Sequence, residues 1–198
     1  MGVDAVRAQS LATVLIIGMG PLGAEIAKNI VLSGCKRLIV CDSTQVTQAD
    51  FAGQFLLRPS DIVHARTRAK ASVPRLRLLN YYIKVDVCST ALDVDEIEGS
   101  TWTECLRTAL AGVSLVIMCG MPPARQVAIN NYCRMKNIWF ISAEVQGLFA
   151  QLFVDGGPEY TVLDTDGEEA KELLLKNITC ANPGVCTSVA RHDLNDGK

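Results

Sequence analysis

Three glycines near the amino terminus have the spacing of a nucleotide-binding turn. Gly18, Gly20 and Gly23 stand between an apolar run and a segment with helical periodicity. In such a turn the first glycine permits a tight bend, the second lets backbone approach a phosphate, and the third lets the helix pack on the sheet. Asp42 follows 19 residues after Gly23, where a carboxylate can accept hydrogen bonds from a ribose. The pattern indicates a nucleotide site, although the same glycines would also serve helix–sheet packing alone.

Two further features bear on an anion at this turn. Pro21 removes one backbone N–H at the start of the helix, which weakens an anion site without abolishing it. A basic series runs from Arg66 to Arg77. It is either the solvated face of a helix or the source of one cation, Arg68, that faces a phosphate.

Few side chains near the turn can do chemistry. The segment 50–55 (Asp-Phe-Ala-Gly-Gln-Phe) offers little reactivity, and neither His64 nor His192 has a partner motif. Cys186 has no base nearby in the sequence that would activate it as a nucleophile. We therefore predict no catalytic residue.

The eight cysteines do not form a metal-binding pattern. None belongs to a C-x-x-C pair and the chain has two histidines, so we predict no metal site. Most of the cysteines lie in apolar stretches, as buried cysteines do. This is typical of reduced thiols in the cytoplasm or nucleus rather than of a secreted disulfide framework.

The surrounding elements predict an α/β fold with a doubly wound, mostly parallel, Rossmann-like sheet. Apolar runs at 13–18, 38–42 and 114–119 are typical of strands buried on both faces, and helical periodicity separates them. Further strands are expected at 81–86, 139–142, 148–154 and 160–163, and helices at 21–33, 60–80, 93–110 and 125–136. Connections after Gly147 are too short for crossover helices, so the additional C-terminal strands are expected to pair antiparallel. Pro74 is expected to start a second helix or to kink the first.

Composition narrows the class of protein. The chain has 198 residues, of which 49% are hydrophobic and 20% charged, so it can form a sizeable core and bury apolar surface against a partner. A net charge of −2 argues against a general nucleic-acid binder. No run of ~20 apolar residues is present, so we expect no membrane span.

Several segments, in the same order, resemble the opening of the ubiquitin-activating enzyme family, whose adenylation halves descend from a ThiF/MoeB-type ancestor. Together they cover most of residues 5–192, and the segments are 13–30, 54–62, 68–75, 79–80, 146–155 and 182–185.

The resemblance implies a silent copy of an adenylation domain. In that family one half binds ATP and adenylates the ubiquitin C-terminus, and the other half is degenerate. Active copies carry a D-x-D motif, an N-x-N-R-Q-type segment and a metal-binding Asp after the fourth major strand. Thr44, Ala52 and Gly53 replace groups of the first two motifs, and the strand ending at Cys119 offers no carboxylate. Such a site has no means to hold Mg²⁺ or to offset charge on a transferring phosphate.

The resemblance also implies an organisation and partners. Residues 1–176 would be the inactive adenylation domain, and residues 177–198 would begin an inserted catalytic-cysteine half-domain, ending without a completed element. The partners would be the active half of the same enzyme, which holds ATP and Mg²⁺, and through it ubiquitin or a ubiquitin-like protein. No cofactor is expected in this segment, and the expected location is the cytoplasm and nucleus.

Two other functions fit part of the sequence. A regulatory subunit of a SUMO- or NEDD8-activating heterodimer would have a similar degenerate domain. An NAD-dependent oxidoreductase would use the glycine turn and Asp42, the two features on which that alternative depends.

Overall fold

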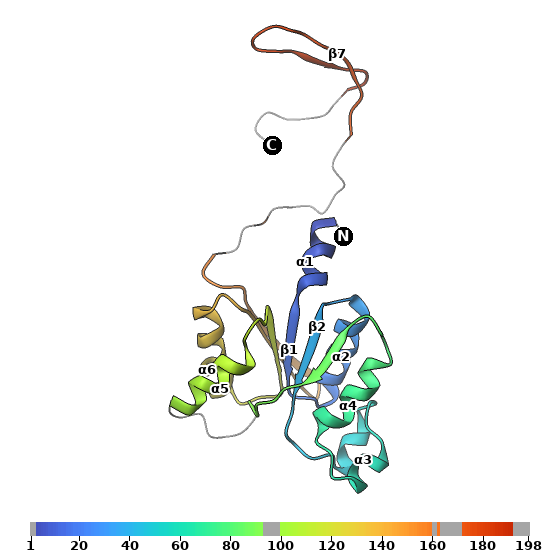
Figure 1. Ribbon diagram of the computed structural model, residues 1–198, viewed down its shortest axis with the longest axis vertical. Helices are drawn as coiled ribbons and strands as arrows, with labels where there is room; N and C mark the ends of the chain where they lie inside the picture. Colours follow the sequence, from blue (N-terminus) through green and yellow to red (C-terminus); the bar gives the residue numbers. More distant parts are fainter. Residues whose placement is uncertain (1–2, 93–99, 160–161, 163–171, 192–198) are drawn as a thin grey trace. The chain divides into compact units, whose positions relative to one another are not determined.

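The computed structural model describes residues 3–92, 100–159, 162 and 172–191 (Figure 1). The chain divides into two compact units, Val3–Val162 and Leu163–Lys198, with the first two residues grouped with the second unit. Each unit is described by itself below.

A six-stranded sheet forms the centre of the first unit. Its strands lie in the order β3-β2-β1-β4-β5-β6, and the first five are parallel. Their bounds are β1 Thr13–Ile17, β2 Arg37–Cys41, β3 Lys84–Val87, β4 Leu115–Cys119, β5 Trp139–Gln146 and β6 Phe149–Asp155. Strand β6 pairs antiparallel with β5. The predicted doubly wound, mostly parallel sheet with an additional antiparallel strand is therefore confirmed.

Helices cover both faces of this sheet: α2 Pro21–Ser33 and α4 Arg68–Arg77 lie on one face, and α5 Ser100–Ala109 and α6 Pro123–Met135 lie on the other (Figure 1). The other helical elements are α1 Val3–Leu11, α3 Pro59–Val63 and a 3-10 turn η1 at Gln48–Ala52. On one face, Val31 of α2 and Leu76 of α4 pack with Ile16 of β1. On the other face, Leu106 of α5 and Ile129 of α6 join the core. Alternate residues of β1 enter opposite cores, so this central strand is buried on both faces.

Of the two expectations for Pro74, the start of a second helix was wrong. Pro74 lies inside α4, which continues from Arg68 to Arg77. A proline there removes one helical hydrogen bond and costs about 3 kcal/mol in an isolated helix. Burial of its neighbours Val73 and Leu76 in the core offsets that cost.

The carboxyl-terminal segment contains a hairpin that its polar composition did not predict. Strands β7 Leu175–Ile178 and β8 Cys186–Ser188 pair antiparallel, so the expectation of no completed element was wrong. Nearly every residue of this hairpin is exposed, and it therefore lacks the apolar alternation by which strands are recognised. The expected boundary at Lys176 falls within β7.

Some expected elements lie partly outside the described residues. Residues 93–99 of the expected helix 93–110 are not described, and the described part is α5. Of the expected strand 160–163, only Val162 is described, and it lies outside any strand. Within the described ranges, none of the helices has the length and apolar character needed to cross a membrane.

Candidate functional site: the glycine turn and its cavity

Two of the three glycines are required by the protein's own packing. Gly18 follows β1 with φ of +93°, and a Cβ there would lie 2.2 Å from the carbonyl oxygen of Cys119. A Cβ on Gly23 would lie 2.0 Å from the carbonyl oxygen of Gly18. Real Cβ atoms do not approach backbone oxygen this closely. Helix α2 can therefore approach the ends of β1 and β4 only if both residues are glycine.

Gly20 has no such packing role. It caps α2 with φ of −67°, a conformation open to any residue, and a Cβ there would meet no atom within 4 Å. Instead, Gly20 lines a cavity at the carboxyl end of the parallel strands. In doubly wound folds this end is where ligands bind.

The cavity is large enough for a small ligand but lacks a side-chain cation to pair with phosphates. Its volume is about 530 Å³, within the range of small-molecule sites. The lining comprises Gly20, Pro21, Leu22, Gly23, Glu25, Gly53, Cys119, Gly120, Glu144 and Val145. No lysine, arginine or histidine is among these lining residues. Of the two acidic residues, Glu25 is paired with Lys28 at 2.5 Å, and the side chain of Glu144 belongs to the face of β5 opposite to that of Val145. The amino terminus of α2 contributes about half a positive charge.

Asp42 holds the glycine turn and is not among the residues that line the cavity. Its side chain is buried; Oδ2 accepts the backbone N–H of Met19 at 2.7 Å, and Oδ1 accepts that of Thr44 at 2.9 Å. Burial raises the pKa of Asp42 above its usual range, although both amides and Arg68 act in the opposite direction. The carboxylate predicted to bind a ribose is thus already engaged by backbone of the turn.

Arg68 is likewise engaged within the protein. Its Nη2 lies 2.6 Å from Oδ1 of Asp50, and its Nη1 lies 3.9 Å from Oδ2 of Asp42. It is not a lining residue of the cavity. Of the residues predicted for the site, Gly20 and Gly23 line the cavity, whereas Gly18, Asp42 and Arg68 do not. Asp42 and Arg68 belong to an ion-pair network with Asp50.

Three more arginines of the basic series face aspartates. Arg66 and Arg75 lie 3.2 and 2.7 Å from the two carboxylate oxygens of Asp61, a side chain with no exposed surface. Arg77 lies 3.4 Å from Asp86. These arginines are therefore ion-paired within the protein, although the side chains of Arg66 and Arg77 remain 46% and 55% exposed.

Sequence reasoning missed Gln54 as a part of the turn. Its side chain is 1% exposed, and Nε2 donates to the carbonyl oxygen of Met19 at 3.0 Å and to Oγ of Ser72 at 3.2 Å. Its Oε1 accepts the backbone N–H of Leu56 at 2.9 Å. Both backbone polar groups of Met19 are thus held by buried side chains. The available signal was a glutamine next to the apolar run 55–57.

The residue set does not fit an adenylation centre. A Cβ on Gly53 would lie 3.0 Å from two side-chain carbons of Pro21, so a larger residue would displace that proline. Burial raises the pKa of the Cys119 thiol to about 12, which leaves it a poor nucleophile. No group of three or more His, Cys, Asp or Glu side chains is placed to hold a metal in the ranges that the structure describes.

His64 and Cys186, for which the sequence indicated no catalytic role, are not among the described residues that line the cavity. Nδ1 of His64 is 2.6 Å from the carbonyl oxygen of Ser60, one turn earlier. Cys186 is exposed on β8 in the second unit. His192 lies outside the described residues.

Comparison with known proteins finds a family model that matches this chain and several similar proteins. The model of the ThiF family matches residues 1–190. Ubiquitin-like modifier-activating enzyme 6 of Mus musculus is 37% identical over 194 residues, which are 97% of this chain and 18% of that protein. Ubiquitin-like modifier-activating enzyme 1 of Homo sapiens is 34% identical over 199 residues, 100% of this chain and 17% of the relative. Ubiquitin-activating enzyme E1 1 of Candida albicans (strain WO-1) is 36% identical over 197 residues, which are 100% of this chain and 18% of that protein.

The chain therefore spans less than a fifth of the length of these relatives. Among solved structures, E. coli MccB with AMPCPP and MccA superimposes with a TM-score of 0.63 at 19% identity, covering 78% of this chain and 43% of the other. MccB with succinimide gives a TM-score of 0.60 at 21% identity, with coverage of 76% and 43%. These structural similarities establish the fold.

Proposed function

The chain belongs to the ThiF family, and we propose that it is the non-catalytic adenylation half of a ubiquitin-activating enzyme. One observation carries the proposal: no lysine, arginine or histidine is among the residues that line the cavity beside the glycine turn. A triphosphate in this cavity would lack a side-chain cation to offset its charge, because Arg68 is held by Asp50. The similarity to ubiquitin-activating enzymes over the whole chain supports the choice of enzyme.

In this proposal the segment acts by packing against the active half of the same enzyme. The hairpin β5–β6 supports that role because one of its faces is apolar and open. From the register, the exposed residues of this face are Val145, Ala150, Leu152 and Val154. Leu152 is 69% exposed and Val145 is 56% exposed. Burial of such side chains contributes about 1.5–3 kcal/mol each, which suits a permanent interface.

The remaining parts of the proposal concern the whole enzyme. The active half would hold ATP and Mg²⁺ and would adenylate ubiquitin or a ubiquitin-like protein. Residues 177–198 would begin the inserted catalytic-cysteine half-domain. The enzyme would work in the cytoplasm and nucleus.

The cavity also weighs against the oxidoreductase alternative. NAD carries a pyrophosphate, which would likewise meet no side-chain cation among the lining residues, and Asp42 accepts from the backbone of Met19 and is not one of those residues. Chain length bears on the other alternative, a regulatory subunit of a SUMO- or NEDD8-activating heterodimer. The matched relatives are single chains more than five times longer than this segment, which favours the ubiquitin type.

The decisive experiment measures ATP–pyrophosphate exchange driven by ubiquitin. The isolated 198-residue chain should give none. In the full-length protein, Leu152→Arg should reduce exchange strongly because it disrupts packing of the two halves, whereas Gly20→Leu, which obstructs the cavity, should leave it unchanged. Exchange by the isolated chain, or its loss with Gly20→Leu, would contradict a scaffold role.

A further inference from the structure

A groove lies on the opposite face of the β5–β6 hairpin, beside α6. It consists of two cavities, of about 220 and 270 Å³, and both are lined by Gln151 of β6. The first contains Glu144, Gln146 and Phe149, and the second contains Val127 and Asn130 of α6. The shared residue makes the two cavities neighbours along one strand.

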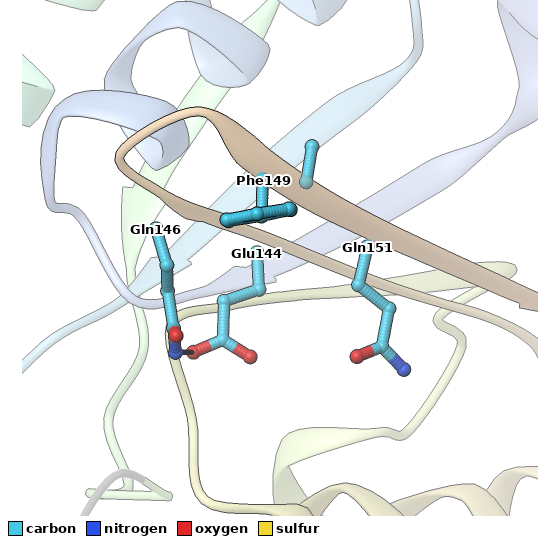
Figure 2. Close-up of a pocket in the computed structure, with 5 residues that line it drawn as sticks. Glu144, Gln146, Phe149 and Gln151 are labelled. Atoms are coloured by element: carbon cyan, nitrogen blue, oxygen red, sulfur yellow. Dashed lines mark hydrogen bonds between the residues drawn. The ribbon is translucent and has the colours of Figure 1, made fainter.

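The first cavity combines one carboxylate with amide groups and an aromatic ring. The register sets Glu144 opposite Gln151, and Gln146 opposite Phe149, so all four side chains belong to one face. Figure 2 shows the three polar side chains extending the same way from the hairpin. Nε2 of Gln146 donates to Oε1 of Glu144 at 2.7 Å. Glu144 is the one charged residue among those lining either cavity.

The second cavity contains a buried acceptor that lacks a donor. Nδ2 of Asn130 donates to Oδ2 of Asp155 at 3.0 Å, which fixes the amide orientation because the oxygen would repel that carboxylate. Oδ1 of Asn130 is buried and accepts no hydrogen bond from the described residues. A buried acceptor without a donor costs about 1–3 kcal/mol, so a ligand N–H placed there would be stabilising.

Apolar surface borders the same groove. Phe149 is 82% exposed and Val127 is 59% exposed, on opposite sides of it. Phe153 packs on Phe140, with ring centroids 6.4 Å apart, and both rings line the second cavity. A ligand here would meet aromatic faces together with amide oxygens and one negative charge.

We infer that this groove binds an extended, basic peptide segment of a partner protein. A Lys or Arg side chain would pair with Glu144, a backbone N–H would donate to Oδ1 of Asn130, and an apolar side chain would cover Phe153. The seven residues of β6 extend about 20 Å at 3.3 Å per residue, which is long enough for a pentapeptide in extended conformation. The proposed scaffold contact uses exposed apolar side chains of the other face, such as Val145 and Leu152.

The probe is a fluorescein-labelled pentapeptide with one arginine followed by alternating threonine and leucine, and its matched control has glutamate for arginine. Fluorescence polarisation with the 198-residue chain should detect the arginine peptide and not the glutamate one. Glu144→Gln should weaken binding roughly tenfold, the equivalent of about 1.4 kcal/mol. Raised salt should weaken binding to the unaltered chain, because the contact is partly ionic.

Two matched arginine substitutions separate the groove from the rest of the surface. Val127→Arg obstructs it and should abolish binding, whereas Leu32→Arg, at a position of similar exposure (57%) on α2, should not. Equal binding of the two peptides, no binding at millimolar concentration, or equal effects of the two substitutions would overturn the inference. Sedimentation provides one more contradicting outcome. If the chain forms a dimer that Val127→Arg dissociates, the groove is buried between two copies and the inference is wrong.

Discussion

Oδ2 of Asp42 accepts the backbone N–H of Met19 at 2.7 Å, so the end of β2 holds the middle of the glycine turn. Gln54 holds the carbonyl group of the same residue. The turn is thus stabilised from both sides by buried side chains of the protein itself.

Replacing Asp42 should therefore loosen the turn. In Asp42→Asn the amide has a single acceptor oxygen, so one of the two backbone N–H groups, of Met19 or Thr44, loses its partner. We expect the free energy of unfolding in urea to fall by about 1–3 kcal/mol. Glu25→Gln, on an exposed part of α2, should change it by no more than about 0.5 kcal/mol. Equal effects of the two changes would refute the role of Asp42.

Gly20 and Gly23 differ in their packing, so they should differ in how well they tolerate substitution by alanine. Gly23→Ala places a Cβ against the carbonyl oxygen of Gly18 and should cost at least ~2 kcal/mol. Gly20→Ala meets open space, so its effect should stay within about 1 kcal/mol. Thermal unfolding of both variants, followed by circular dichroism, checks this order. A Gly20→Ala variant as unstable as Gly23→Ala would show that the turn is packed differently.

Acid should destabilise the protein through Asp61. Burial acts to raise the pKa of Asp61, but hydrogen bonds from Arg75 and the Arg58 amide outweigh it, and the pKa lies below its usual range. The folded state therefore binds this proton more weakly than the unfolded state, whose carboxyl titrates near about 3.9. The stabilisation is complete above that pH and is lost as pH falls through the folded-state pKa.

The measurement is urea unfolding at pH 7 and at pH 3. Asp61→Asn should lose roughly 3 kcal/mol at pH 7, because Arg66 and Arg75 lose their shared partner, and should show a smaller difference between the two pH values. Asp42→Asn should still lose stability between pH 7 and pH 3. The pKa of Asp42 is raised in the folded state, so its titration contributes to the pH dependence of stability with the opposite sign. A pH dependence unchanged in Asp61→Asn would contradict this assignment.

Cysteine reactivity should follow burial. With a pKa of about 12, roughly one Cys119 thiol in ten thousand is ionised at pH 8, and the side chain is 6% exposed. Iodoacetamide should therefore label the exposed Cys180 and Cys186 rapidly and Cys119 only after unfolding. Mass spectrometry of tryptic peptides provides the readout. If Cys119 in the folded protein were labelled as fast as Cys180, its thiol would be neither buried nor of raised pKa, and the prediction would be contradicted.

Local pattern was sufficient for most of the first unit. The apolar run before Gly18 and the helical spacing after Pro21 predicted β1 and α2, because burial on both faces of a parallel strand leaves a continuous apolar run. Pattern failed where tertiary contacts outweigh local preference. Packing around Val73 keeps α4 helical through Pro74, and the β7–β8 hairpin has no apolar alternation to reveal it.

By itself, the sequence determined the order and type of the central elements, the glycine turn, and the absence of familiar catalytic groups around it. Only the tertiary structure decided what Asp42 and Arg68 do. Their roles depend on which distant groups meet them: Asp42 meets Met19 of the turn, and Arg68 meets Asp50, which the fold brings beside the start of α4. Hydrogen bonds and ion pairs require contact within about 3–4 Å, and separation along the chain does not encode it.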